Sequence, residues 1–125
     1  MDDLHARALG KAVLANLRDE EQTVFLKSLR FTKRTPKTNT KKEDLLKELE
    51  TTRNRGYSIN NEEYLLGLVC IGAPLVNYNT KAVAGAVSLD FPAAEFPLSI
   101  IERNYTGILT KLASELSGII TLLDV

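Results

Sequence analysis

Side chains that could act as nucleophiles, metal ligands or proton carriers are few in this sequence. It contains one cysteine, Cys70, and one histidine, His5. A structural zinc site takes four Cys or His ligands, and a thiolate nucleophile needs a base beside it. A single Cys and a single His, far apart in the chain, make a poor basis for either. We therefore expect no metal site, no cofactor and no enzymatic activity.

The glycine and carboxylate patterns lead to the same expectation. Gly10 lies in the run Leu9-Gly10-Lys11-Ala12, which has neither the spacing nor the preceding strand of a phosphate-binding loop. Glu62 and Glu63 are adjacent, and adjacent residues of a strand point to opposite faces of the sheet. These two carboxylates are thus not expected to share acid–base work.

A binding pocket is the remaining chemical possibility. Apolar residues at helical spacing predict a first helix from Leu4 to Leu17, and small residues fill its first turns. The N-terminus of a helix offers unpaired N–H groups, and small side chains would let a carboxylate reach them. Gly10 in this helix has a second explanation, which is tight packing on a sheet. Cys70 and Ser88 either line the pocket or are an ordinary buried thiol and an ordinary strand hydroxyl.

A second helix and a basic loop follow. The helix is predicted from Asp19 to about Leu29, with acidic residues at its start and basic residues at its end. A Thr-rich loop over 31–39 comes next, and seven basic residues lie between Lys27 and Lys42. Because neither a repeated interleaving of aromatic residues nor a reading helix accompanies them, they favour a solvated loop over a nucleic-acid surface.

The third predicted helix has the clearest sequence boundaries. Thr40 and Glu43 have the spacing of a capping box, which would start the helix at its N-terminus. The helix should end near 53–55, because Gly56 is suited to the left-handed position that terminates helices.

From Tyr57 onward the pattern predicts strands. A short strand at 57–60 precedes a long apolar strand over 66–76, and a second alternating strand over 82–89 forms a hairpin with it. The turn of the hairpin is predicted at 77–80. A long final helix is predicted with Pro97 at its first helical position. This order of elements predicts an α+β fold whose narrow antiparallel sheet is incomplete and would attract another strand.

Composition predicts one domain over residues 1–125. Hydrophobic residues make up 44% of the chain, charged residues make up 26%, and the formal net charge is zero, so no global field draws it to nucleic acid or to a membrane. Apolar stretches are interrupted before the ~18 residues that a membrane span needs. The first residues lack the pattern of a signal peptide, and the single cysteine fits a reducing compartment. We expect a cytoplasmic protein.

Four motifs, in order, resemble the effector-binding domain of IclR-type transcriptional regulators. The run LHARALGKAVLA at 4–15 is similar to that family's LHATALGKALLA, and RGYSINNEEY at 55–64 is similar to its RGYAVDDEEY. The run GLVCIGAPL at 67–75 resembles GVRCIAAPV, and AGAVSL at 84–89 resembles AALSVS. The resemblance covers almost the whole chain.

This resemblance implies a GAF-like antiparallel sheet packed against helices, with a small organic effector between them. Ligands of the family are typically organic acids or aromatic compounds. Asn60 stands where the family often has Asp, and Asp90 stands where it often has Ser, which favours a neutral or hydroxylated compound. The effector-binding residues implied by the resemblance are Ala8, Leu9, Gly10, Asn60, Cys70, Ser88 and Asp90.

Relative to the family pattern, a winged helix-turn-helix and the first strands of the sensing domain are missing. We therefore expect a partial domain, truncated on its N-terminal side, that makes no direct contact with nucleic acid. The exposed sheet edge is expected to be covered in a homo-oligomer. Two functions remain open: an effector-sensing module of a transcriptional regulator, or a ligand-free dimerisation module that pairs with full-length regulators.

Overall fold

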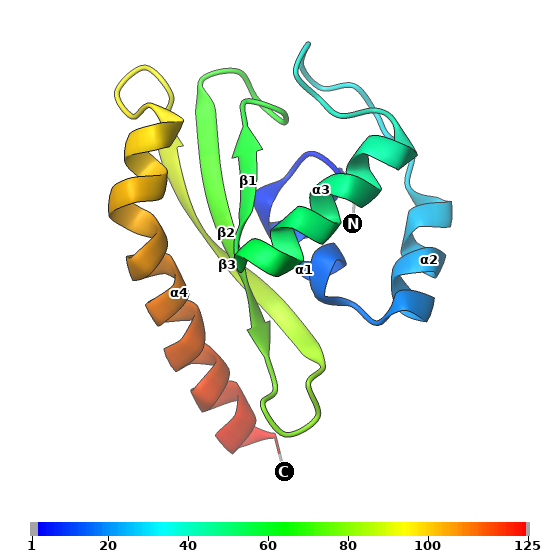
Figure 1. Cartoon of the computed structure of the whole chain (residues 1–125), viewed down its shortest axis with the longest axis vertical. Helices are drawn as coiled ribbons and strands as arrows, with labels where there is room; N and C mark the ends of the chain where they lie inside the picture. The colour runs from blue at the N-terminus through cyan, green and yellow to red at the C-terminus, as the bar shows by residue number, and fades with distance from the viewer. Residues whose placement is uncertain (1–2, 125) are drawn as a thin grey trace.

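The computed structural model describes residues 3–124 and contains one three-stranded antiparallel sheet between two layers of helices (Figure 1). Helix α4 covers one face of the sheet, and α1, backed by α3, covers the other. The predicted α+β order is confirmed. The elements are α1 (Ala8–Asn16), α2 (Asp19–Ser28), α3 (Lys42–Arg55), β1 (Ser58–Asn61), β2 (Leu68–Val76), β3 (Val83–Pro92) and α4 (Leu98–Leu123).

The two faces of the sheet differ in chemistry because the register places like residues in rows. Strand order is β1-β2-β3, and Asn60, Cys70 and Asp90 are directly opposite one another. Paired residues share a face and neighbours alternate, so this row lies on the α1 face. The α4 face carries one of two apolar cores, whose fully buried or nearly buried members are Val69, Ile71, Ala73, Phe91, Ile101, Leu109 and Ala113; the other lies among α1, α2 and α3.

Helix α1 begins at Ala8, not at Leu4 as the periodicity predicts. Residues 4–6 form a turn instead, closed by a hydrogen bond from the Ala6 N–H to the Asp3 carbonyl. The reason is a close backbone contact. A Cβ on Gly10 would lie 2.5 Å from the Cα of Leu4, so the chain before α1 folds back over the helix. Gly10 therefore serves packing, against this turn and not against the sheet.

Two helix starts also differ by one residue from the sequence prediction. Lys41 precedes α3 without a side-chain cap, so the Thr40–Glu43 capping box is wrong. The side-chain carbonyl of Asn39 accepts the Lys41 N–H at 3.3 Å and shifts the helix start along the chain. Pro97 is the residue before α4, not its first residue. The end of α3 is as predicted, since Gly56 has φ +94° and donates its N–H to Thr52.

By length and mean hydropathy, α4 could cross a membrane, although the sequence predicts no such segment. Its packing gives another explanation for this composition. Ile101, Leu109 and Ala113 are buried against the sheet, as in an amphipathic helix packed on one face, although only 17% of its most apolar window is buried. Length and composition alone do not separate these two cases.

Candidate functional site

A small cavity lies between the first turn of α1 and the polar row of the sheet. Its volume is about 100 Å³. It brings together six of the seven residues implied by the family resemblance, and Gly10 is the one that does not line it. The lining residues are Arg7, Ala8, Leu9, Asn60, Tyr64, Leu68, Cys70, Ser88 and Asp90. Their role in binding an effector stays a prediction.

The start of α1 supplies hydrogen-bond donors to this cavity. The first intrahelical bond is made by the Lys11 N–H to the Arg7 carbonyl, so the preceding N–H groups have no partner within the helix. Ser58 fixes this end of the helix, because its Oγ donates to the Ala8 carbonyl at 2.6 Å. Gly72 permits the close approach, since a Cβ there would lie 2.9 Å from the same carbonyl oxygen. The positive end of α1 is thus held against the sheet.

The sheet supplies a row of polar side chains across its three strands. Asn60 is 2% exposed, and its Oδ1 accepts the Glu63 N–H at 2.8 Å. Burial and, to a smaller extent, the nearby Asp90 carboxylate together raise the pKa of the Cys70 thiol to about 12, while a hydrogen bond from Asn60 opposes the shift. Ser88 Oγ donates to Asp90 Oδ1 at 3.0 Å. Cys70 is therefore a protonated thiol at neutral pH, unsuited to nucleophilic attack.

Arg7 and Tyr64 also line the cavity, and the sequence prediction did not include either of them. Arg7 Nη2 donates to the Tyr64 hydroxyl at 2.6 Å, and the guanidinium carbon lies 4.0 Å from the centre of the Tyr64 ring. A signal was present, because Arg7 occupies the place of Thr in the family run LHATALGKALLA. Arg7 adds a positive charge to the same lining that carries Asp90.

Within residues 3–124, no three His, Cys, Asp or Glu side chains come together as metal ligands. Glu62 and Glu63 lie in bends after β1, not in a strand, and they have separate partners. Glu62 forms an ion pair with Lys37 at 2.8 Å, whereas Glu63 contacts the buried ammonium of Lys11. The predicted strand position of these two carboxylates is wrong. They are separated because each is paired with a different lysine.

Comparison with known proteins gives one consistent answer. Residues 1–118 match the family described as "Bacterial transcriptional regulator IclR C-terminal". The probable HTH-type transcriptional regulator ArcR of Halobacterium salinarum is 32% identical over 94% of this chain, and the HTH-type transcriptional regulator KdgR of Escherichia coli is 32% identical over 92%. This chain spans 43% of the length of each of these two relatives.

Solved structures agree. The IclR structure of Thermotoga maritima is 34% identical, with a TM-score of 0.87, over 95% of this chain and 47% of that one. The C-terminal domain of E. coli KdgR is 30% identical, with a TM-score of 0.83, over 94% of this chain and 71% of that one. The inducer-binding domain of PobR from Acinetobacter, solved with 3-hydroxybenzoic acid, shares the fold with a TM-score of 0.84 at 24% identity, over 93% of this chain and 68% of that one. These relatives are transcriptional regulators and not enzymes.

Proposed function

The chain belongs to the IclR C-terminal family, the effector-binding domains of transcriptional regulators, and from this premise we propose that the cavity under α1 binds its effector. The observation that carries the proposal is the meeting of the α1 N-terminus with the Asn60–Cys70–Asp90 row. Helix donors and side-chain acceptors then line one small, partly open space. A ligand there can bond to both walls at once.

The lining selects a compact ligand with hydroxyl groups. A volume of about 100 Å³ has room for only a few heavy atoms, so a larger ring would need the Arg7–Tyr64 contact to open. One side of the ligand would accept from the α1 N–H groups or from Arg7. The other would donate to Asp90, whose carboxylate can only accept. A small hydroxylated acid satisfies both demands, and the relative PobR was solved with a hydroxylated aromatic acid.

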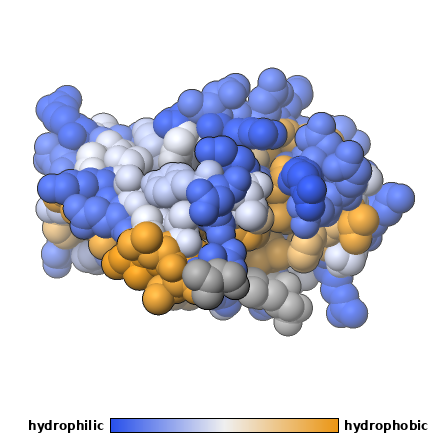
Figure 2. All heavy atoms as spheres, turned by 90° about the horizontal axis from the view of Figure 1, so that it is seen from below, coloured by the Kyte–Doolittle hydropathy of each residue, from blue (hydrophilic) through white to orange (hydrophobic). Residues whose placement is uncertain are grey.

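We further propose that a second copy of the chain covers the free edge of β3. The sheet order leaves β3 with one hydrogen-bonding neighbour over its ten residues. Exposed apolar side chains gather beside the end of α4, where Ile119, Leu122 and Leu123 are 53–80% exposed (Figure 2). Burying both surfaces would remove unpaired backbone groups and apolar area from water. In the whole regulator, effector binding would shift the balance between assemblies and thus the spacing of DNA-binding domains.

We also propose that the module is cytoplasmic and that its own surface contacts neither a membrane nor nucleic acid, in line with its formal net charge of zero. A ligand-free dimerisation module is the second candidate, and the small volume of the cavity is the observation that favours it. The two candidates differ in one respect: only a sensor loses function when the cavity is filled and the dimer stays intact.

The decisive experiment combines ligand titration with sedimentation. Short hydroxy acids and hydroxylated aromatic acids are titrated by calorimetry into the chain, into Ser88→Leu, which fills the cavity, and into Ser99→Leu as a control outside it. The proposal predicts binding to the chain and to Ser99→Leu, and at least about a tenfold loss in Ser88→Leu, the scale of 1.4 kcal/mol. Equal affinity in all three proteins contradicts the effector site. A monomer at micromolar concentration in all three contradicts the covered β3 edge.

A further inference from the structure

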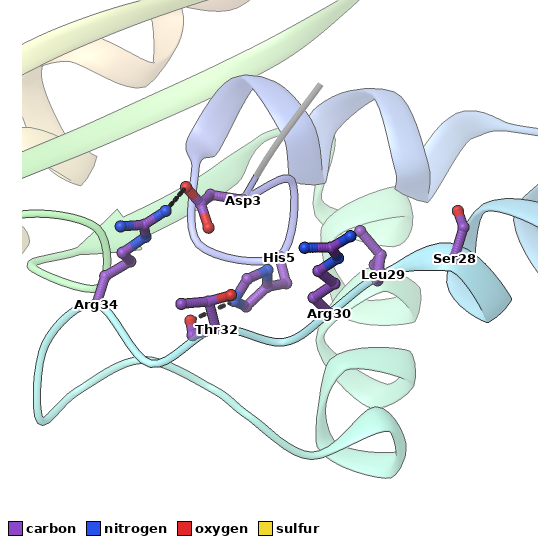
Figure 3. Close-up of a pocket in the computed structure, with 7 residues that line it drawn as sticks. All are labelled: Asp3, His5, Ser28, Leu29, Arg30, Thr32 and Arg34. Atoms are coloured by element: carbon purple, nitrogen blue, oxygen red, sulfur yellow. Dashed lines mark hydrogen bonds and ion pairs between the residues drawn. The ribbon is translucent and has the colours of Figure 1, made fainter.

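A second pocket lies on the other side of the N-terminal turn, against the segment that follows α2 (Figure 3). Its volume is about 170 Å³, and His5, Leu29, Arg30 and Thr32 are among its lining residues. None of these four residues lines the cavity under α1. The proposed effector site therefore does not account for this pocket.

His5 gives the pocket a buried acceptor. The ring is 1% exposed, and its Nε2 lies 2.8 Å from the carbonyl oxygen of Thr32. A carbonyl only accepts hydrogen bonds, so Nε2 must carry the ring proton. In the neutral ring, Nδ1 then carries a lone pair. This nitrogen is itself buried and has no hydrogen-bond partner within residues 3–124, so a ligand in the pocket reaches it only when the groups that cover it move. A contact with the Phe31 ring, 5.5 Å between centres, helps to fix the orientation of the imidazole.

Arg30 gives the pocket an uncompensated positive charge. Figure 3 shows its side chain beside the His5 ring, and it makes no ion pair with any residue in 3–124. Asp3 is the one acidic residue among those that line the pocket, and its carboxylate lies 2.7 Å from Arg34 Nη2. The negative charge of Asp3 is thus already matched, while that of a ligand could be matched by Arg30.

One nearby feature opposes an anion. Helix α2 ends at Ser28, so the negative end of its dipole is directed toward the pocket. Part of this effect is removed because the Ser28 hydroxyl donates to the Phe25 carbonyl at 2.9 Å. A direct hydrogen bond between a guanidinium and an anionic oxygen is stronger than the field of a ten-residue helix end in contact with water.

We propose that this pocket binds inorganic phosphate. A P–OH would donate to Nδ1 of His5, and the charged phosphate oxygens would accept from Arg30. Near neutral pH, phosphate keeps at least one proton and so offers a donor and acceptors on one small tetrahedral group. Sulfate has the same shape but no proton, so it cannot satisfy a neutral His5. The site is independent of the proposed effector cavity.

The test uses inorganic phosphate and the single histidine of the chain. Since His5 is the only histidine, the imidazole ¹⁵N signals are assigned without further work. Titration with phosphate should move the Nδ1 signal in a saturable way, whereas sulfate at the same ionic strength should leave it in place. No movement, or equal movement with both anions, overturns the proposal, as does a crystal soaked in phosphate that shows only an ordered water at Nδ1.

Three variants, followed by calorimetry with phosphate, separate the two contacts from general charge. His5→Gln keeps an N–H for the Thr32 carbonyl but lacks Nδ1, and Arg30→Gln removes the cation. Lys33→Gln is the matched control, because Lys33 is exposed, lies in the same segment and does not line the pocket. We expect about a tenfold or greater loss of phosphate affinity for His5→Gln and for Arg30→Gln, the scale of one charge-assisted hydrogen bond, and less than about twofold for Lys33→Gln.

Equal losses in all three variants indicate general charge attraction and overturn the site. Circular dichroism checks that each variant is folded, and Arg30→Gln, an exposed position, keeps the test open if His5→Gln unfolds.

Discussion

Lys11 Nζ lies 2.5 Å from Glu63 Oε1, in a position where the lysine side chain has no exposed surface. The same ammonium contacts the Glu48 carboxylate and lies 2.9 Å from the Ile59 carbonyl oxygen. These acceptors match the three protons of the ammonium. Through them, one charge on α1 is bonded to α3, to β1 and to the bend that follows β1.

Removing this charge should be costly. Lys11→Ala takes the ammonium away from the Glu48 and Glu63 carboxylates, of which Glu63 still accepts the Asn61 N–H, and it opens a cavity, so we expect the free energy of unfolding to fall by about 3–5 kcal/mol. Lys11→Met should lose less, because it fills the space and both carboxylates retain some contact with water. Urea unfolding measures both values. Lys47→Ala, on the exposed side of α3, is the control and should change stability by less than about 0.5 kcal/mol. If Lys11→Ala behaves like the control, the ammonium contributes nothing net.

Two glycine substitutions should have opposite signs. In Gly10→Ala, the new methyl group meets backbone atoms of Leu4 at 2.5 Å, which cannot move aside like a side-chain end. We expect a loss of about 1–3 kcal/mol from overpacking. In Gly107→Ala on α4, nothing lies within 4 Å of the new methyl group, and helix propensity should stabilise the chain by ~1 kcal/mol. Thermal unfolding of both variants tests this, and a stabilised Gly10→Ala would show that the turn before α1 is not packed as described.

The Cys70 thiol should react slowly and in a way that depends on Asp90. Thiol reagents attack the thiolate, and a pKa of about 12 leaves very little of it at pH 8. Asp90→Asn removes a negative charge and a hydrogen-bond acceptor, so the pKa of Cys70 should fall while burial keeps it above its ordinary value. The pH at which alkylation accelerates is the measurement, because it separates ionisation from access. An unchanged pH profile in Asp90→Asn, matching that of the exposed control Asp44→Asn, would contradict the coupling.

Stability at high pH should report the contact between Tyr57 and Glu102. Burial raises the pKa of Tyr57, and the hydrogen bond and charge of Glu102 raise it further, while Arg55 lowers it. A group whose folded pKa is raised contributes stability that is complete below its unfolded pKa, about 10 for tyrosine, and is lost as the pH rises through the folded value. Wild type should therefore lose more stability than Tyr57→Phe as the pH rises above about 10, the ordinary pKa of tyrosine. Parallel stability curves for the two proteins would show that the phenol does not feel the carboxylate.

The order of elements was predictable because periodicity reports which face of each element is buried. The start of α1 was not, because a contact between Leu4 and Gly10 lies outside any helical pattern. The same holds for the start of α3, where the side chain of Asn39, and not that of Thr40, accepts a backbone N–H, that of Lys41. Local propensity decides such ends only when no side chain or backbone nearby offers a better partner.

The cavity under α1 was predictable from the family resemblance and not from composition. Asn60, Cys70 and Asp90 are up to thirty positions apart, and only the strand register places them in one row. Arg7 was not predicted as a lining residue, because its position depends on a hydrogen bond to Tyr64, 57 positions along the chain. The unpartnered nitrogen of His5 could not be predicted either, because it requires knowing that Thr32 occupies the other one.

The unequal faces of the sheet have a consequence for how such a domain can change over generations. On the side of the sheet that meets α4, large aliphatic and aromatic side chains pack together and stabilise the fold. The opposite side is furnished with small and polar groups whose replacement removes little apolar contact. Under the proposed function, ligand preference can therefore change at Asn60, Ser88 and Asp90 without disturbing the apolar packing on the α4 side, whereas positions such as Gly72 that hold α1 against the sheet are constrained.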